Sequence, residues 1–478
     1  MNLYNTRTRR VETLEPMDGK RLRIYVCGLT PSAQAHLGHA RSFLFFDILR
    51  RYLEHKGYDV TYVQNVTDVD DRSIATAHEE GTTYRAVIER NYGSFKASMR
   101  ALRVREPDEE PYATAFIPQI QEMIRALVQS GNAYAVRDGV YYAVRTFARY
   151  GTLSNRNIEE LEAGARIEIG EHKRDPLDFA LWKFAKEGEP SWPFDGYGAG
   201  RPGWHIECSA MSRALLDPQG IGFDIHGGGA DLIFPHHENE IAQSEPLMAK
   251  PPMAKHWSHG GLLLFEGKKM SKSLGNFEPL SELLQRYDPQ AIRVLFLQTG
   301  YRKVMNFTPE SIAGATVTLE RLKKTYRASR YGSNGSSGLL GRVEAALDDD
   351  VNTAVALAHV LQDESPATAE FETALRLLGI EPNEDWLREP AIGASEDERA
   401  RIVAGLRDEG SRRWESDPDG TALQIVQERT QARARKDWAR ADALKKELTQ
   451  HHVGIKDAPD GTTQWWWERP QTAARPPS

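Results

Sequence analysis

The N-terminal part of the chain contains two alternating segments on either side of a helical pattern. Arg23–Cys27 alternates between polar and apolar positions and is β-branched or aromatic at its centre, which is typical of a buried strand. Beyond Gly28, apolar residues recur at helical spacing up to Gly57, so we expect a helix that begins at or near His36–His39. Asp59–Val66 alternates again. This succession is the unit of a parallel sheet, whose ligands bind at the carboxyl ends of the strands.

Between residues 133 and 192 the pattern changes to short strands and charged loops. Val140–Val144 and Ala165–Ile169 are examples of these short strands. The pattern of a buried strand returns at Phe223–His226, so we interpret the segment between as an insertion into the sheet domain. Two helices are expected before it, at Thr82–Arg103 and Ile117–Ser130.

From Thr308 onward the pattern is helical. Ala313–Arg327 and Gly341–Leu361 have amphipathic spacing, and a Gly/Ser-rich linker separates them. Ile425–Leu448 carries seven Lys or Arg residues against four acids. This composition suits phosphate contacts, but a solvated helix face has the same pattern. The last residues, 469–478, are expected to be disordered.

Composition narrows the class of protein. With 478 residues the chain can form two or three domains, and 40% hydrophobic with 27% charged residues is typical of a soluble protein. The chain has no long apolar run and no secretory pattern, so we expect no membrane contact and a cytoplasmic location. The net charge of −7 means that nucleic acid would have to be bound by local basic surface. Two cysteines exclude a disulfide scaffold.

The start of the first helix is a candidate phosphate site. Unpaired backbone N–H groups at a helix N-terminus attract anions, and His36 and His39 add side-chain donors there. Gly38 between them lets a flat ring approach the backbone. An ordinary capping or surface feature would have the same residues. The polar run Asn65–Asp71, at the end of the second strand, is open to two interpretations in the same way: a substrate contact, or a loop that caps the next helix.

A second group of polar residues follows Phe223–His226. Three glycines at 227–229 allow backbone to lie close to a ligand, and Pro235 suits the first turn of a helix. On that helix His236 and Glu240 are four residues apart and share one face, which makes half of a metal site.

The two cysteines, Cys27 and Cys208, are candidates for the other half of this site. Two thiolates, an imidazole and a carboxylate would suit zinc, although no C-x-x-C spacing supports it. Buried free cysteines beside a solvated helix are the alternative. A metalloprotease motif is excluded because Ile241 stands where a second histidine would be required.

The segment Glu266–Asn276 has three lysines and two hydroxyl residues between glycines. Such a loop can fold over a triphosphate, although most lysine-rich loops are simply solvated. It does not match the Walker pattern.

Taken together, these segments resemble the class I aminoacyl-tRNA synthetases. His36–His39 is similar to their HIGH signature, and Lys269–Ser273 is a complete KMSKS signature. Cys27, Gly203–Cys208 and the run DIHGGG…FPHHENE at 224–240 resemble the cysteinyl-tRNA synthetase family in detail, and the resemblance covers nearly the whole chain. It implies a Rossmann-type parallel-sheet α/β catalytic domain split by an insertion, followed by a helical bundle and a small C-terminal domain.

The resemblance also implies boundaries and roles. The expected parts are the first half of the catalytic domain (1–115), the connective insertion (116–202), the second catalytic half (203–305), the helical bundle (306–400), the anticodon-binding domain (401–468) and the tail (469–478). The implied catalytic residues are His36, His39, Lys269 and Lys272; the ATP-binding residues are His36, Gly38, His39, Gly228, Gly229 and Lys272. The implied cysteine-pocket residues are Thr67, Trp204 and His226, and the implied zinc ligands are Cys27, Cys208, His236 and Glu240.

The implied reaction has two steps. L-cysteine and ATP, bound with Mg²⁺, give cysteinyl-adenylate, and the amino acid then passes to the 3′ end of tRNA(Cys); one Zn²⁺ per chain selects the thiol, and the family resemblance implies a monomer. The loop Thr30–Ala35 and Leu37 depart from the usual family sequence. Two alternatives are a cysteine ligase of mycothiol synthesis, which lacks the full anticodon-binding end, and a non-catalytic synthetase-like protein that binds RNA or senses an amino acid.

Overall fold

The computed structural model describes residues 1–157, 172–269, 278–331, 338–363, 366–387, 418–435, 437–451, 453–457 and 463–467. The chain divides into two compact units, Met1–Pro382 and Asn383–Ser478. Within the part of the chain that is described, every helix is too short or too polar to span a lipid bilayer.

A four-stranded parallel sheet lies at the centre of the first unit. Its strands stand in the order β10 (Ala254–Gly260), β9 (Phe223–Gly229), β3 (Arg21–Val26) and β4 (Asp59–Gln64). The predicted strand, helix and strand are therefore confirmed. The chain enters the sheet at β3, in the middle, and adds β4 on one side and β9 and β10 on the other. Such a change of direction opens a crevice at the carboxyl ends of the strands.

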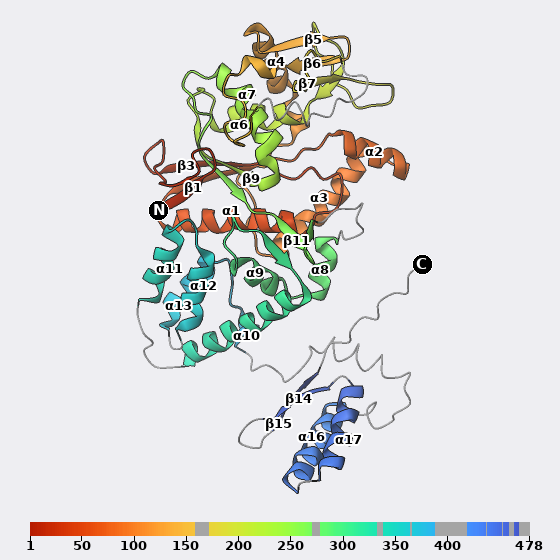
Figure 1. Ribbon diagram of the computed structural model, residues 1–478, viewed down its shortest axis with the longest axis vertical. Helices are drawn as coiled ribbons and strands as arrows, with labels where there is room; N and C mark the ends of the chain where they lie inside the picture. Colours follow the sequence, from red (N-terminus) through yellow and green to blue (C-terminus); the bar gives the residue numbers. More distant parts are fainter. Residues whose placement is uncertain are drawn as a thin grey trace. The chain divides into compact units, whose positions relative to one another are not determined.

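Helices cover both faces of this sheet (Figure 1). Helix α1 (Leu37–His55) lies along one face, and α6 (Trp204–Leu216) and α7 (Glu238–Ser244) lie on the other. The close contact between α1 and the sheet explains Gly227, because a Cβ atom there would lie 2.2 Å from Cζ of Phe46. The first of the three glycines therefore makes room for a core ring, not for a ligand.

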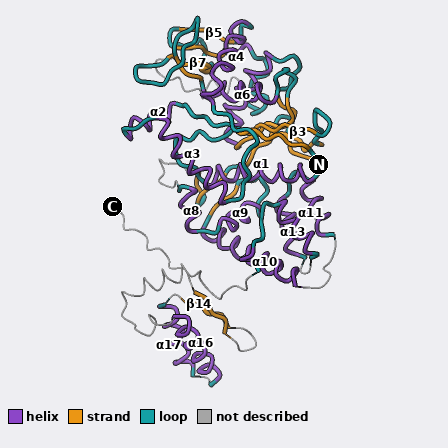
Figure 2. Tube along the Cα trace, turned by 180° about the vertical axis from the view of Figure 1, so that it is seen from behind, coloured by secondary structure: helices purple, strands orange, loops and turns teal. Residues whose placement is uncertain are grey.

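The insertion forms a sheet of its own, separate from the central strands (Figure 2). Its antiparallel strands are β5 (Ala133–Val136), β6 (Gly139–Tyr142), β7 (Phe179–Phe184) and β8 (Gly200–Pro202). The helices before it are α2 (Asp71–Glu80), α3 (Tyr84–Ala101) and α4 (Ile117–Gln129). The pattern did not predict α2, whose N-cap is Asp70. The predicted strand Ala165–Ile169 lies outside the described residues.

After the central sheet come a small sheet and a group of helices. The small sheet has the order β12 (Lys268–Lys269), β11 (Leu263–Phe265) and β13 (Met305–Phe307). The helices are α8 (Leu280–Arg286), α9 (Pro289–Leu297), α10 (Pro309–Tyr331), α11 (Leu339–Asp348), α12 (Thr353–Gln362) and α13 (Thr368–Leu377). The remaining elements are β1 (Asn2–Asn5), β2 (Arg10–Thr13) and short 3₁₀ or π turns at Ala113–Phe116, Val144–Thr146, Ala230–Leu232, Ile233–His237, Glu245–Leu247 and Glu384–Trp386.

The predicted amphipathic segment Gly341–Leu361 is not one helix. It breaks between α11 and α12, where Asp350 and Val351 have φ of 55° and 51°. Asn352 then caps α12 by accepting the backbone N–H of Val355. Helical spacing continues through the break, so the pattern alone did not reveal it.

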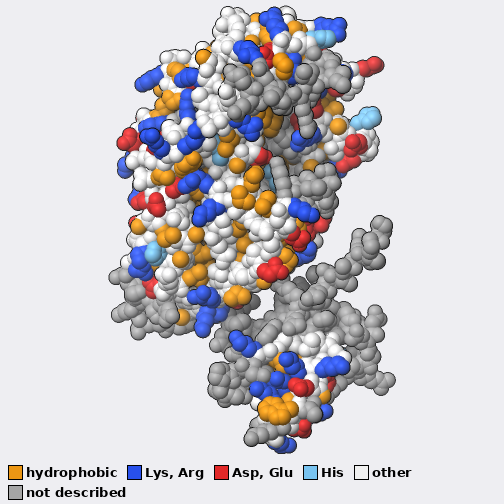
Figure 3. Space-filling model, viewed as in Figure 1, with side chains coloured by type: hydrophobic (Ala, Val, Ile, Leu, Met, Phe, Trp, Pro, Cys, Tyr) orange, Lys and Arg blue, Asp and Glu red, His pale blue; other side chains and the backbone are white. Residues whose placement is uncertain are grey.

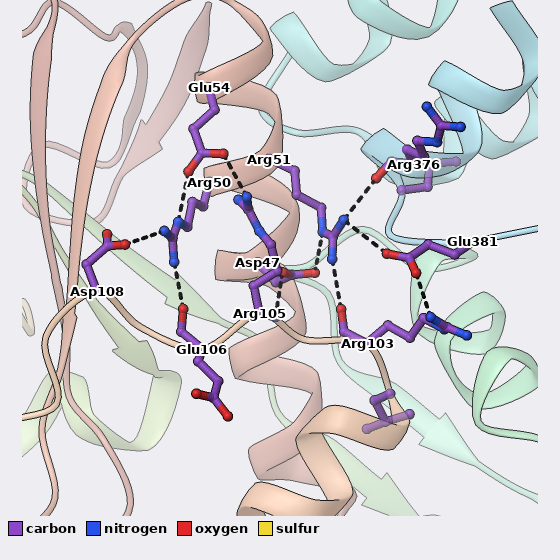
Figure 4. Close-up of polar contacts among 12 residues, drawn as sticks. Asp47, Arg50, Arg51, Glu54, Arg103, Arg105, Glu106, Asp108, Arg376 and Glu381 are labelled. Carbon is purple, nitrogen blue, oxygen red and sulfur yellow. Dashed lines mark hydrogen bonds and ion pairs between the residues drawn. The ribbon is translucent and has the colours of Figure 1, made fainter. Parts of the chain in front are cut away.

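Helix α1 is held against the neighbouring elements by a buried carboxylate (Figure 4). Asp47 accepts Nε–H of Arg51 at 2.9 Å and the backbone N–H of Arg105 at 3.0 Å. It also pairs with Arg293 of α9. Arg51 also donates to the backbone carbonyl of Arg376 in α13. The helix that begins with the histidine pair is therefore tied to the helical group by charged hydrogen bonds.

The second unit is small. It contains α16 (Pro418–Ala434), α17 (Trp438–Gln450) and an antiparallel pair, β14 (Val453–Asp457) and β15 (Thr463–Trp467). Arg429 on α16 is buried, which removes it from the predicted phosphate contacts.

Over the face of the molecule in Figure 3, basic and acidic side chains are interspersed, in keeping with the modest net charge.

Candidate active site

A cleft of about 430 Å³ opens at the carboxyl ends of β3, β9 and β10. Each strand contributes the residues that follow it or end it, as expected where a parallel sheet changes direction. The predicted site residues that line the cleft are Cys27, His36, Gly38, His39, Trp204, Gly228 and Gly229.

The histidine pair begins α1 with its two rings stacked, 3.8 Å between centroids. Nδ1 of His36 accepts the backbone N–H of Gly38 at 3.0 Å, and Nδ1 of His39 accepts that of His36 at 3.2 Å. Burial lowers the pKa of His39 to about 3, so its ring is neutral. Because Nδ1 accepts in both rings, the ring proton lies on Nε2, which can donate. The histidines therefore cap the helix and also carry donors suited to an anion.

The two cysteines, far apart in the sequence, meet below the cleft. One ligand atom from each of Cys27, Cys208, His236 and Glu240 lies within 4.8 Å of the others, and all four residues are buried. Cys27 follows β3, Cys208 lies in α6, His236 lies in the turn Ile233–His237, and Glu240 lies in α7. The Sγ atom of Cys27 is 3.3 Å from Oε1 of Glu240, and Nε2 of His236 is 3.2 Å from the same oxygen.

The chemistry of these donors fits a cation. Burial raises the pKa of both thiols. Cys208 and then Glu240 raise the pKa of Cys27 further, whereas at Cys208 the hydrogen bond with Cys27 lowers the pKa and Glu240 raises it. Burial lowers the pKa of His236 to about 3, so its imidazole is neutral and has a lone pair to offer. A divalent ion that prefers sulfur and nitrogen would relieve the repulsion between two thiolates and a carboxylate. The residues present therefore fit zinc.

A buried hydroxyl supports this conclusion. Tyr25 is fully buried, and its hydroxyl, which makes no well-formed hydrogen bond among the described residues, lies beside the thiol of Cys208. Burial and then the neighbouring Cys208 raise the pKa of Tyr25, so the hydroxyl keeps its proton. An O–H of this kind would find its acceptor in a cysteine thiolate, the form of the side chain that binds a metal.

Comparison with known proteins identifies the family. Residues 13–317 match the model of the class I (C) tRNA synthetase catalytic domain, and residues 417–466 match that of the cysteinyl-tRNA ligase anticodon binding domain. A cysteine–tRNA ligase of Pseudomonas aeruginosa is 41% identical over 97% of this chain and 99% of its own length. The chain belongs to the cysteinyl-tRNA synthetase family. The corresponding ligase of Pelotomaculum thermopropionicum is 42% identical over 96% of this chain and 99% of its own.

Among solved structures, this synthetase resembles the methionyl-tRNA synthetase of Mycobacterium tuberculosis in complex with methionyl-adenylate. The TM-score is 0.57 at 15% identity, with 81% of this chain and 96% of that chain covered. At this level of identity the likeness concerns the fold, and it agrees with the split parallel-sheet architecture described above.

Around the four candidate ligands of this synthetase lies a second layer of histidines. His237 places Nε2 3.3 Å from Sγ of Cys27 and Nδ1 2.7 Å from Nε2 of His259. His226 places Nε2 2.9 Å from Oε2 of Glu240 and stacks on Trp257. A second set of residues is close enough to share an ion. One ligand atom from each of Cys27, His226, His237 and Glu240 lies within 4.8 Å of the others, so geometry alone permits this ligand set as well.

The predicted cysteine-pocket residues occupy different depths. Trp204 lines the cleft and stacks on His236 at 4.4 Å between centroids. Thr67 and His226 are buried behind the wall of the cleft.

Of the signature lysines, Lys269 ends β12 and only its backbone is described, whereas Lys272 lies outside the described residues.

Arg72 and Asp231 also line the cleft, although neither of them was assigned a role from the sequence. Asn65, the first residue of the polar run considered above, accepts the backbone N–H of Gly28 at 2.9 Å beside the sulfur of Cys208. A second cleft of about 530 Å³, next to the insertion, shares Arg72 and Trp204 with the first. The capping interpretation of the polar run Asn65–Asp71 is confirmed, since Asp70 caps α2, and Asn65 supports the end of the neighbouring strand.

Proposed function

We propose that this chain is a cysteine–tRNA ligase, which activates L-cysteine with ATP and transfers the cysteinyl group to the 3′ end of tRNA(Cys). One observation carries the proposal: a single cleft reaches both the histidine pair that begins α1 and Cys27 of the thiol-rich cluster. A site for an anion and a site for a thiol therefore stand side by side, as the joining of cysteine to a nucleotide requires.

Activation requires a carboxylate and the α-phosphate of ATP to be aligned while negative charge develops. We assign the binding of phosphate to the N-terminus of α1 and to Nε2–H of His36 and His39. Gly228 and Gly229, at the end of β9, leave room for the nucleotide along the wall of the cleft. Lys269 and Lys272 are proposed to add positive charge at the phosphates, with Mg²⁺ accompanying ATP.

We assign Cys27, Cys208, His236 and Glu240 to one Zn²⁺. When bound, this ion supplies a soft Lewis acid that favours a thiolate over the hydroxyl of serine, so selection needs no editing site. Trp204 covers His236 on the cleft side and restricts access of water. His226 holds Glu240 from behind, and Thr67 supports the strand end beside Asn65.

A specific observation favours tRNA over an amino sugar as the acceptor. The match at residues 417–466 is to an anticodon binding domain, and the chain spans 99% of the length of the ligases compared above. We further propose that the enzyme acts as a monomer in the cytoplasm, where its three substrates occur.

The proposal is tested by cysteine-dependent exchange of pyrophosphate into ATP, with serine as the matched amino acid, before and after removal of metal by a chelator. We expect exchange with cysteine only, loss on chelation and recovery with Zn²⁺. Charging of tRNA(Cys) with labelled cysteine tests the second step. Exchange that persists without metal would refute the zinc assignment, and absence of exchange in the metal-loaded protein would refute the activity.

A further inference from the structure

Arg41 lies in α1, two residues after His39, and its side chain is buried. The guanidinium donates to four backbone carbonyls and, among the described residues, to no carboxylate. Nη1 binds the carbonyls of Gly261 and Leu262 at 3.1 and 2.8 Å, and Nη2 binds those of Gly300 and Lys303 at 3.2 and 2.6 Å.

These carbonyls belong to two segments that pack tightly against each other. The backbone N–H of Gly261 donates to the carbonyl of Tyr301 at 2.6 Å, and that of Met305 donates to the carbonyl of Leu262 at 3.0 Å. A Cβ atom on Gly261 would lie 2.5 Å from the carbonyl oxygens of Arg302 and Lys303. Several backbone carbonyl oxygens therefore lie close together beside Gly261. Their dipoles point toward the guanidinium of Arg41, which is the cation that compensates them.

The residue type suits this role. Burial lowers the pKa of Arg41 to about 10, so the group stays charged at neutral pH. A planar guanidinium can direct two N–H groups from each of two nitrogens toward four fixed acceptors, whereas a lysine ammonium has three donors around one atom. The arrangement therefore depends on arginine and not on positive charge alone.

Helix α1 and the first of these segments both line the cleft. His36, His39 and Ser42 line it from α1, and Gly260–Leu263 line it from the end of β10 onward, whereas Gly300–Lys303 support the second group from behind. We propose that Arg41 is a positioning residue for ATP, which sets the distance between the histidine pair and the wall that continues into β11. The inference rests on the proposed function for the identity of the nucleotide, and it concerns alignment, since Arg41 itself is not among the residues that line the cleft.

The test compares Arg41→Lys and Arg41→Ala with Arg50→Ala, a matched control on the same helix. Arg50 is less deeply buried, with 11% of its side chain exposed, and it binds Glu54, the carbonyl of Glu106 and Asp108, all outside the cleft lining. For each full-length, metal-loaded protein we would measure the affinity for a non-hydrolysable ATP analogue by calorimetry, the KM values for ATP and cysteine in exchange, and the melting temperature.

We expect Arg41→Ala to weaken binding of the analogue and to raise the KM for ATP by about tenfold or more, since small displacements of aligned groups carry costs of this size. The KM for cysteine should stay within about twofold. Arg41→Lys should fall between, and added guanidinium should partly restore the Ala variant. Arg50→Ala should lower the melting temperature without changing ATP affinity.

Unchanged ATP affinity in a folded Arg41→Ala or Arg41→Lys variant would overturn the inference. Equal losses for ATP and cysteine, without rescue by guanidinium, would also overturn it, because they indicate general damage to the fold. If the wild-type protein shows no exchange, the proposed function fails, but the calorimetric comparison still decides whether Arg41 positions the nucleotide site.

Discussion

Nε2 of His237 lies 3.3 Å from Sγ of Cys27, and this contact ends a chain of buried hydrogen bonds. Nδ1 of His237 meets Nε2 of His259 at 2.7 Å, and Nδ1 of His259 meets the hydroxyl of Thr6 at 2.8 Å. A thiolate can only accept, so with Cys27 deprotonated each donor in the chain is fixed. Thr6 donates to His259, His259 donates to His237, and His237 donates to the sulfur.

We predict that His237→Phe lowers the affinity of the protein for Zn²⁺ by about 10–100-fold, because the thiolate loses its donor. His237→Gln should retain part of the affinity, since its amide can donate. Competition with a chromogenic chelator measures the effect, and His78→Gln, on the exposed side of α2, is the control. If the Gln and Phe variants lose metal equally, His237 is a ligand and the alternative set with His226 is the correct one.

A substitution of Trp204 tests the proposed cysteine pocket without changing a candidate metal ligand. Its ring is 41% exposed and stacks on His236 at the cleft wall. Stacking of this kind contributes roughly 0.5–1.5 kcal/mol, so we predict that Trp204→Ala lowers kcat/KM for cysteine about 2–10-fold in pyrophosphate exchange. Trp438→Ala, which removes an exposed ring from the second unit, should leave exchange unchanged. Equal activity of the two variants would remove Trp204 from the pocket.

Local pattern was enough for part of this architecture. The strand at Arg23–Cys27 and the helix after it follow from alternation and apolar spacing, and His236 with Glu240 follow from the four-residue repeat of a helix. Their meeting with Cys27 and Cys208 could not be derived in this way, because it depends on how α6 packs on β3. Donor chemistry suggested the four as one zinc set and the family resemblance implied it, and their role as ligands is a proposal.

Other features were hidden because their signals are tertiary. In the sequence, Arg41 looks like an ordinary polar residue of a helix, because its partners are backbone carbonyls more than 200 residues away. Tyr25 and His259 read as strand residues. The helix breaks at Asp350 because the backbone there is left-handed, and the sequence has no glycine at this position that would have indicated it. Each of these residues has its role because it is buried beside particular partners. The spacing of hydrophobic residues does not indicate which polar groups will be buried together.

Gly28 is predicted to be the most sensitive glycine of the site. A Cβ atom there would lie 1.6 Å from the backbone carbonyl oxygen of Asn65, which cannot move without shifting the end of β4. We expect Gly28→Ala to lower the melting temperature and to reduce zinc content, because Cys27 is adjacent. Gly93→Ala is the control, since nothing lies within 4 Å of that position in α3 and alanine favours a helix by about 1 kcal/mol. A Gly28→Ala protein with full metal content would contradict the expectation.

Asp47 gives a prediction about stability and its dependence on pH. Burial alone would raise the pKa of this carboxyl, but Arg293 and Arg51 outweigh it, so the pKa is lowered in the folded chain. A lowered pKa means that the ionised form stabilises the fold above the unfolded value of about 3.9, and that this contribution is lost as the pH falls through the folded pKa.

Asp47→Asn would leave Arg293, which is almost fully buried, without its carboxylate. We expect a loss of about 3–5 kcal/mol in the free energy of unfolding at pH 7, and a weaker decline of stability below about pH 4 than in the wild type. Urea titrations between pH 7 and pH 3 measure both. Asp18→Asn, which breaks only the exposed pair with Arg21, should cost less than about 1 kcal/mol. Equal losses for the two variants would mean that the guanidinium of Arg293 is sustained by its carbonyl partners, Leu102 and Leu378, without help from Asp47.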